Sequence, residues 1–201
     1  MRSVVAAVGL IGLLAAGCGP AGPAATPAPA RITSGERVAV PGAADVLVAY
    51  PETIIAYRAD DRGAYVVVLE PGPAGDAVRA RLRAGGDADA VGDDGEVRRL
   101  TAAEHEALIT TAGVRAIPVL QPSERRSAVT MAAAARAGGA SIDVRIDLFT
   151  DASADEAAAV VAWIAWRGGT VGWRGPTALT ATLPADQIGP ASRLSPVRWV
   201  E

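Results

Sequence analysis

The sequence has a single cysteine and a single histidine, and it contains neither lysine nor asparagine. One cysteine excludes an internal disulfide and any metal site built from a cluster of cysteines. All 19 basic residues are arginines, and 22 acidic residues outnumber them. A mildly acidic chain without a basic patch is a poor candidate for a nucleic-acid-binding protein, so we expect no nucleic acid among its partners.

The scarcity of histidine also argues against an enzyme. His105 is the only candidate for a histidine general base, and it stands between Glu104 and Glu106 in the first turn of an expected helix. A hydrolase needs a nucleophile, a base and an orienting group within reach of one another, and no Gly-x-Ser-x-Gly motif accompanies this histidine. We therefore interpret His105 as a solvated helix residue and expect no catalytic residues and no cofactor.

An acidic cluster surrounds one glycine-containing turn of the chain. Its members are Asp87, Asp89, Asp93, Asp94 and Glu96. A calcium site needs six or more oxygen ligands, and the spacing of an EF-hand loop is absent here. Aspartate and glycine are both common in turns, because aspartate bonds to nearby backbone and glycine adopts unusual backbone angles. We therefore expect a hairpin turn and no metal site.

Residues 1–18 have the features of an export signal. An apolar run from Val4 to Ala16 follows Arg2, and it is too short for a membrane-spanning helix, which needs about 20 residues. The run ends in Leu14-Ala-Ala-Gly-Cys18, which resembles the lipobox of bacterial lipoproteins, with the leucine one place further from the cysteine than usual. The resemblance implies an exported protein whose Cys18 carries a diacylglyceryl group and anchors it to the extracytoplasmic side of the cell membrane. The alternative is an ordinary secretory signal.

Two further segments precede the expected folded units. Residues 19–34 are rich in proline, alanine and glycine, and they predict an extended tether that holds a folded domain off the membrane. Residues 35–63 are a strand-prone lead-in that Pro51 interrupts. We expect two short strands in this lead-in, Val46–Ala49 and Thr53–Tyr57, lying beside the first of two repeats.

Residues 141–201 form the more distinct of these repeats. Apolar and charged residues alternate from Ile142 to Leu148, which predicts a strand with one solvated face. Ser153 and Glu156 have the spacing of a capping box, so a helix is predicted from here to Gly168-Gly169. Two strand-like runs, a short helix and a closing strand follow: Thr170–Trp173, Ala178–Leu183, Pro184–Leu194 and Val197–Val200. The order βαββαβ is that of the ferredoxin-like split unit.

The same order recurs in residues 64–122. Its expected elements are Tyr65–Glu70, Gly75–Ala84, Ala88–Val91, Glu96–Leu100, a helix capped by Thr101 and Glu104, and Val114–Ile117. One unit of about 60 residues buries only about 60% of its unfolded surface and is marginal alone. We therefore predict an α+β fold in which two tandem ferredoxin-like βαββαβ units pack together.

A connector, residues 123–140, joins the two repeats. Its alanine-rich run Ala128–Ala137 has high helix propensity but almost no large side chain to bury. Both a helical connector and a mobile linker are compatible with this composition.

All four tryptophans lie in the second repeat: Trp163, Trp166, Trp173 and Trp199. Tryptophan fills protein cores, and it is also enriched among the residues that dominate binding interfaces. Trp163 and Trp166 share one side of the expected helix, rotated from its apolar face, so at least one of these indoles should be exposed. Trp173 and Trp199 are the candidates for contact with a partner protein.

Three stretches indicate a family resemblance. They are Gly113–Pro122, which runs through a closing strand into a Gln-Pro connector, the strand Ile142–Phe149, and the closing stretch Leu194–Glu201. Over residues 64–201 the tandem order resembles the N-terminal prodomains of fervidolysin-like, subtilisin-type serine proteases. The resemblance implies a detached prodomain that binds, chaperones or regulates such a protease through a sheet face. No protease domain follows Glu201 in this sequence, so the catalytic serine, histidine and aspartate of that family have no counterpart here.

Other functions are compatible with the same residues. The chain could be a general extracytoplasmic module for protein binding or assembly, or the truncated N-terminal part of a secreted subtilisin-like protease. A prodomain inhibits by placing the residues after its last strand in the protease cleft. Only Glu201 follows the expected last strand, and one extended residue reaches about 3.5 Å at most. We therefore expect binding with weak or absent inhibition.

The lipobox-like motif makes Cys18 the residue on which membrane anchoring depends. Substituting Cys18→Ala removes the thiol that would receive the lipid, so the protein should move from the detergent-soluble membrane fraction to the secreted fraction. Fractionation and immunoblotting of cells expressing each form measure this. A variant that stays with the membranes as fully as the parent would contradict the lipoprotein assignment.

Overall fold

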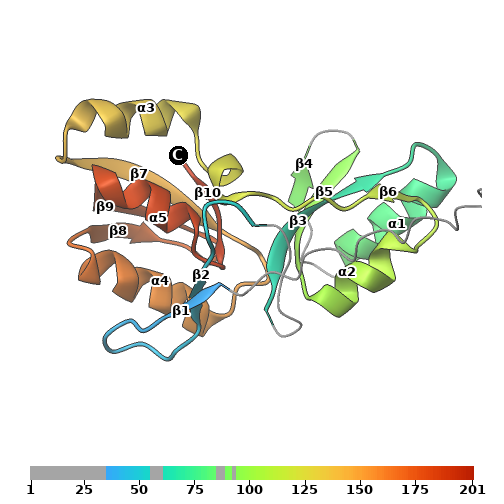
Figure 1. Ribbon diagram of the computed structural model, residues 1–201, viewed down its shortest axis with the longest axis horizontal. Coiled ribbons are helices and arrows are strands. Elements are labelled where there is room, and N and C mark those ends of the chain that lie inside the picture. The colour runs from blue at the N-terminus through green and yellow to red at the C-terminus, as the bar shows by residue number, and fades with distance from the viewer. Residues whose placement is uncertain (1–34, 55–60, 85–88, 92–93) are drawn as a thin grey trace, which may run out of the picture.

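The computed structural model describes residues 35–54, 61–84, 89–91 and 94–201. The expected signal peptide with Cys18 and the expected tether lie outside the described residues, as do Ile55–Tyr57 of an expected strand and Asp87 and Asp93 of the acidic cluster. The described chain is an α+β fold in which two units of helix and sheet lie side by side (Figure 1). Its strands form one two-stranded sheet and two four-stranded sheets.

The first unit, residues 63–116, has an antiparallel sheet with two helices. Its elements are β3 (Gly63–Leu69), α1 (Pro73–Ala84), β4 (Asp89–Val91), β5 (Gly95–Leu100), α2 (Ala102–Ile109) and β6 (Val114–Ala116). The strand order is β4-β5-β3-β6, and each neighbouring pair is antiparallel. Val67 and Leu69 of β3 pack with Val78 and Leu82 of α1 and Leu108 of α2. The helices therefore cover one face of this sheet.

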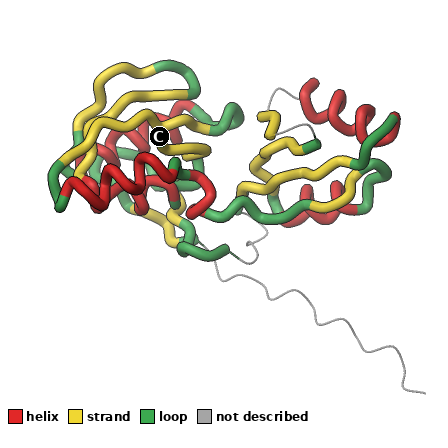
Figure 2. The backbone as a smooth tube through the Cα atoms, turned by 90° about the horizontal axis from the view of Figure 1, so that it is seen from above, coloured by secondary structure: helices red, strands yellow, loops and turns green. Residues whose placement is uncertain are grey.

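The second unit, residues 141–200, repeats this arrangement. Its elements are β7 (Ser141–Leu148), α4 (Ala154–Trp166), β8 (Thr170–Arg174), β9 (Ala178–Pro184), the 3₁₀ turn η2 (Ala185–Gln187), α5 (Ile188–Ser192) and β10 (Val197–Val200). The strand order is β10-β7-β9-β8, again with antiparallel neighbours. Val160 and Ile164 of α4 and Ile188 of α5 pack against Ile146 and Leu183 of the sheet. The tube in Figure 2 shows this unit and the first one as separate bodies joined by a narrow waist.

Two capping boxes start the helices α2 and α4. The Thr101 hydroxyl accepts the backbone N–H of Glu104, whose carboxylate accepts the N–H of Thr101 in return, and Ser153 and Glu156 form the same pair of bonds. Each box satisfies two of the backbone donors that a helix start leaves without partners. Both boxes confirm the prediction from residue spacing. Gly168, which follows α4, has a φ of 80°, a left-handed conformation that favours glycine at a helix end.

The lead-in segment lies on a different unit from the one expected. β1 (Glu36–Val38) and β2 (Leu47–Ala49) form an antiparallel hairpin, and Leu47 is fully buried in the core of the second unit. Ala49 also forms a bridge to Leu194. The expectation that this segment lies beside the first repeat is therefore wrong for the hairpin. The physical reason is that α4 has apolar surface beyond the sheet, which Val38 and Leu47 cover.

The end of the lead-in then passes to the first unit. Tyr50 and Ile54 are buried in the core of that unit, together with Tyr65 and Ile117. Glu52 attaches this segment to the connector and to the second unit, because its carboxylate forms ion pairs with the guanidinium groups of Arg126 and Arg193. Residues 35–54 therefore contact both units along a short stretch of chain.

The connector between the units is ordered and largely helical. Residues 118–120 run antiparallel to β3, with Val66 N–H donating to Pro118 O and Leu120 N–H donating to Ala64 O. The 3₁₀ turn η1 (Pro122–Arg125) and the helix α3 (Ala128–Ala137) follow. Of the two alternatives for the alanine-rich run, the structure has the helix, and Met131 and Ala134 pack against the core of the second unit.

The shared hairpin and junction predict that the second unit is unstable alone. Residues 141–201 lack Val40 and Leu47, and burying one large aliphatic side chain contributes about 1.5–3 kcal/mol. We expect fragment 141–201 to unfold with a free energy about 3 kcal/mol or more below that of fragment 35–201. Denaturant unfolding followed by circular dichroism measures both. Equal midpoints and slopes for the two fragments would show that the second unit is independent.

Candidate functional site

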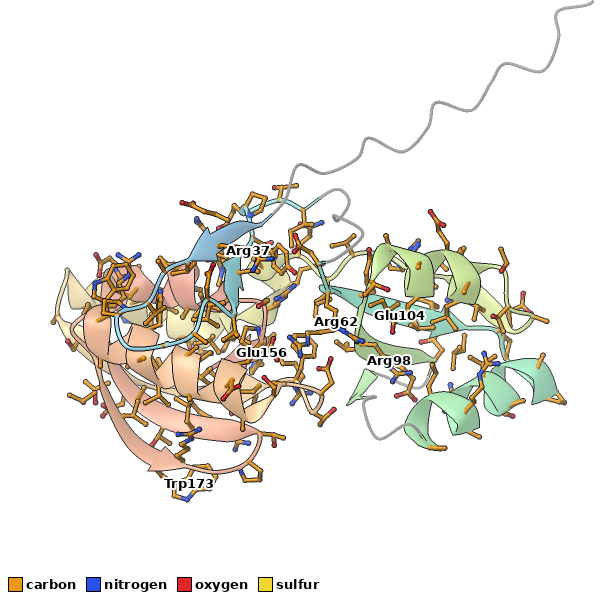
Figure 3. The ribbon with its side chains drawn as sticks, turned by 90° about the horizontal axis from the view of Figure 1, so that it is seen from below. Arg37, Arg62, Arg98, Glu104, Glu156 and Trp173 are labelled. Atoms are coloured by element: carbon orange, nitrogen blue, oxygen red, sulfur yellow. The ribbon has the colours of Figure 1, made fainter. Side chains whose placement is uncertain are left out.

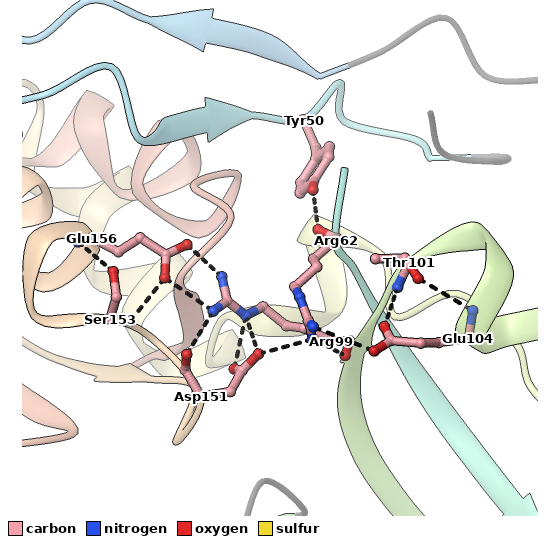
Figure 4. Close-up of polar contacts among 8 residues, drawn as sticks. All are labelled: Tyr50, Arg62, Arg99, Thr101, Glu104, Asp151, Ser153 and Glu156. Atoms are coloured by element: carbon pink, nitrogen blue, oxygen red, sulfur yellow. Dashed lines mark hydrogen bonds and ion pairs between the residues drawn. The ribbon is translucent and has the colours of Figure 1, made fainter. Parts of the chain in front are cut away.

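The junction between the units is built around the buried side chain of Arg99. This arginine lies in β5, and its guanidinium is directed at the N-terminal end of α4 in the other unit (Figure 4). Its Nε donates to Asp151 Oδ1 at 2.8 Å, and its Nη1 donates to Glu156 Oε1 at 2.7 Å. Its Nη2 donates to Glu156 Oε2 at 3.1 Å and to the backbone oxygen of Asp151 at 3.1 Å. Two carboxylates and a carbonyl thus neutralise and bind one buried cation.

The electrostatics of this cluster follow from its burial and its partners. Burial raises the pKa of Glu156, but its hydrogen bonds with Arg99, the charge of Arg99 and the cap at Ser153 outweigh this and hold the pKa below its ordinary value of 4.5. Burial by itself would lower the pKa of Arg99. The hydrogen bonds to Glu156 and Asp151 and their negative charges together have the larger effect, so the pKa lies above its ordinary value. Both groups are therefore charged at neutral pH, and neither is poised to exchange a proton there.

A second, more exposed layer of charge surrounds this pair. Arg62 lies 3.3 Å from Glu104 and 3.7 Å from Asp151, so it links the capping box of α2 to the acidic loop of the second unit. The Tyr50 hydroxyl donates to the backbone oxygen of Arg62, which holds this segment beside the junction (Figure 4). Burial raises the pKa of Glu104, but the backbone N–H of Thr101 and the charges of Arg62 and Arg98 outweigh it and lower the pKa.

Arg125 is the second buried cation of the junction. Its side chain is fully buried, with its guanidinium 5.8 Å from the ring centre of Phe149 and 6.0 Å from that of Tyr50. It donates to Leu120 O and to Val197 O, each at 3.3 Å. Phe149 in turn packs on Ala64 and Val97, on the face of the first sheet turned away from its helices. The guanidinium of Arg125 therefore contacts the lead-in at Tyr50, the segment before the connector at Leu120, and the second unit at Phe149 and Val197.

The predicted partner-binding residues lie on opposite edges of the second sheet. Trp173 belongs to the edge strand β8, is 58% exposed and points outward from the unit (Figure 3). Trp199 belongs to the other edge strand, β10, is half-buried and pairs in register with Asp147. Strands β7 and β9 lie between the two tryptophans, so the structure does not bring them into contact.

The face of the sheet between these strands is open to solvent. Its exposed residues are Asp143 and Arg145 of β7 and Thr180 of β9, which alternate with the buried residues that face the helices. The backbone N–H of Trp173 donates to the Thr180 hydroxyl at 2.9 Å, so the backbone of Trp173 lies beside an exposed residue of this face. Both predicted tryptophans therefore flank a polar, solvent-exposed sheet surface.

The other two tryptophans divide between core and surface. Trp163 is buried at 2% exposure among the apolar residues of α4 and the sheet, whereas Trp166 is 48% exposed. This confirms that at least one indole of the helix is exposed.

His105 does not occupy the solvated position expected of it. Its ring centre lies 4.8 Å from that of Tyr65, its Nε2 lies 3.3 Å from Ile117 O, and the side chain is half-buried. The histidine therefore packs between α2 and the sheet, where its neighbours are an aromatic ring and a carbonyl. These neighbours do not form a nucleophile–base pair.

Among residues 35–54, 61–84, 89–91 and 94–201, no three His, Cys, Asp or Glu side chains gather in a way that could hold a metal ion. Within the same ranges, no helix has the length and apolar character needed to cross a bilayer. Comparison with models of protein families, with curated proteins and with solved structures found no match to this chain.

Residue spacing did not identify the junction. Arg99 is 52 residues from Asp151 and 57 from Glu156, and Arg125 is 72 residues from Val197. The sequence does signal that Glu156 begins a helix, but a capping glutamate looks the same whether or not an arginine binds it. A pair of adjacent arginines, Arg98-Arg99, in a strand between the apolar residues Val97 and Leu100 was the available signal.

The depressed pKa of Glu156 predicts a pH-dependent contribution to stability. Substituting Glu156→Gln keeps the capping box but removes the charge that binds Arg99, so we expect a loss of about 2 kcal/mol at pH 7. Because the folded-state pKa lies below the ordinary value of 4.5, this contribution is complete above pH 4.5 and declines as the pH falls through the folded-state pKa. The difference between parent and variant should therefore shrink toward pH 3 in urea unfolding.

Glu104→Gln is the matched control for this measurement. Glu104 has the same capping position in α2, but its side chain is 44% exposed and pairs with the exposed Arg62. A pair of this kind contributes about 1 kcal/mol or less. Equal losses in the two variants, or a Glu156→Gln loss that does not change with pH, would contradict the assigned role of the junction.

Proposed function

We propose that this protein is a non-catalytic, lipid-anchored envelope protein that binds a partner protein through the open sheet face of its second unit. The partner that the sequence resemblance favours is a subtilisin-like serine protease, for which the chain would act as a detached prodomain. The observation that carries the proposal is the solvent-exposed sheet face flanked by Trp173 and Trp199, opposite a face that α4 and α5 cover.

The proposed fold is a tandem of ferredoxin-like units. Each unit has the element order βαββαβ, if η2 and α5 are taken together as the second helix of the second unit. In each sheet the first strand is central and lies between the third and the fourth, while the second strand is at one edge. This strand order and the antiparallel pairing support the proposal, because they are what a split βαβ unit requires.

The open face has the composition of a protein-binding surface. Trp173 is exposed at 58%, and a large exposed indole at a sheet edge has an apolar surface that a partner can bury. The central strand β7 supplies charges of both signs, Asp143 and Arg145, which suit a specific protein surface better than a nucleic acid or another polyanion. The connector helix α3 packs Met131 and Ala134 against the core, on the helix side of the sheet.

Anchoring would place this face outside the cell membrane. The proposed lipid on Cys18 and the proline-rich residues 19–34 precede β1, which enters the second unit directly. A tethered binding module of this kind would hold a secreted protease near the membrane where both are exported.

The test is direct binding to subtilisin-like proteases encoded in the same genome. Fragment 35–201 should bind at least one of them, and Trp173→Ala should weaken binding about 30-fold, the effect of losing about 2 kcal/mol at a hot spot. Trp199→Ala should weaken it in the same direction. Biolayer interferometry measures the affinities, and a peptidase assay on the same samples measures inhibition.

Trp166→Ala is the matched control, because Trp166 is also exposed but belongs to α4 on the helix side of the sheet. The Trp166→Ala variant should bind the protease with the same affinity as the parent protein. Absence of binding to every protease tested would remove the protease from the proposal and leave a general binding module. A loss with Trp166→Ala but not with Trp173→Ala would show that the sheet face is the wrong surface.

A further inference from the structure

A groove on the other side of the second unit has features of a second binding site. It has a volume of about 770 Å³ and lies between the hairpin β1–β2 and the C-terminal end of α4. Its walls include Arg37 of β1, Trp166 and Arg167 at the end of α4, and Pro190 and Arg193 near α5. Figure 3 shows Arg37 and Trp173 on opposite sides of this unit, so the groove is distinct from the open sheet face.

The end of α4 provides an aromatic wall. Trp166 is 48% exposed, and the guanidinium of Arg167 lies 4.2 Å from the centre of its ring. Arg167 caps the helix, with its N–H donating to Trp163 O, so its positive charge is stabilised by the negative end of the helix. An indole with a guanidinium beside it can contact an apolar side chain and an acidic group at the same time.

The strand β1 provides a backbone wall. Within the part of the chain that the structure describes, its ladder partner is β2 alone, so β1 is the outer strand of a two-stranded sheet. All three of its residues, together with Ala39, line the groove. The outer edge of a strand offers N–H and C=O groups that an extended peptide can pair with, as in the addition of a strand to a sheet.

The charges around the groove define which segment suits it. Arg37, Arg167 and Arg193 line it, against one lining carboxylate, that of Glu36, while Glu52 pairs with Arg193 from outside the lining. The excess of positive charge favours an acidic occupant. The chain's own segment 19–34 has Arg31 as its only charged residue, so charge does not favour that segment.

We propose that this groove binds an extended, acidic segment of a partner protein, which pairs with the edge of β1. Apolar side chains of the segment would pack on Trp166, and its carboxylates would meet Arg37 and Arg167. This site goes beyond the proposed protease-binding face, since neither Trp173 nor Trp199 contributes to it.

The test uses the full chain in a mild detergent and two fluorescein-labelled octapeptides. One alternates valine with glutamate, and the other alternates valine with lysine. Fluorescence anisotropy should show binding of the glutamate peptide about tenfold tighter or more than that of the lysine peptide, and weaker at high salt. Trp166→Ala and Arg167→Ala should each weaken binding of the glutamate peptide about tenfold. Hydrogen exchange should show that the peptide protects the amides of residues 36–39.

Two variants serve as controls for these substitutions. Trp173→Ala changes another exposed indole, on the open sheet face, and Arg136→Ala changes an exposed arginine of α3. Both should bind the glutamate peptide as the parent does. Equal affinity for the two peptides, no binding of either, no effect of Trp166→Ala and Arg167→Ala, or no protection of residues 36–39 would each overturn the proposal. Binding that persists while the protease-binding face fails its own test would leave this inference standing, because the two sites share no residue.

Discussion

The ion pairing of Arg99 is the interaction on which the arrangement of the two units depends. A buried guanidinium is costly to desolvate, and it is stable only where carboxylates and carbonyls replace the water it loses. Asp151 and Glu156 supply those groups from the opposite unit. Separating the units would break these ion pairs, and water would have to replace the hydrogen bonds between Arg99 and the two carboxylates. The cost of this loss fixes the position of α4 relative to β5 more strictly than apolar contact alone, because ion pairs with good geometry are directional.

The remainder of the junction extends this arrangement through the chain between the units. Arg125 lies near the rings of Phe149 and Tyr50 and donates to the backbone oxygens of Leu120 and of Val197 in β10. The hairpin β1–β2 completes the core of the second unit, while Tyr50 and Ile54, a few residues later, enter the core of the first. Units of about 60 residues bury a smaller fraction of their surface than larger domains do, so these shared segments explain how two small cores become stable together.

The structure separates two surfaces with different physical character. The sheet face of the second unit carries mixed charge and two flanking indoles, whereas the groove beside β1 combines an indole, three arginines and a strand edge. Covering one face of a sheet with helices leaves the other face available, and adding a hairpin to the helix side creates the groove. Arg99 and Arg125 line neither surface, whereas Tyr50, which contacts Arg125, lines the groove and so links it to the junction.

The sequence by itself determined the local structure: the alternation in β7, the capping boxes at Ser153 and Thr101, the glycine end of α4 and the repeated element order. These features depend on residues a few positions apart, where spacing alone sets which side chains meet. Only the tertiary structure decided that the hairpin β1–β2 packs on the second unit, that Trp163 is buried while Trp166 is exposed, and that Arg99 binds Glu156. The partners in these contacts are tens of residues apart, and no local pattern marks which of several apolar faces or acidic residues a distant side chain will reach.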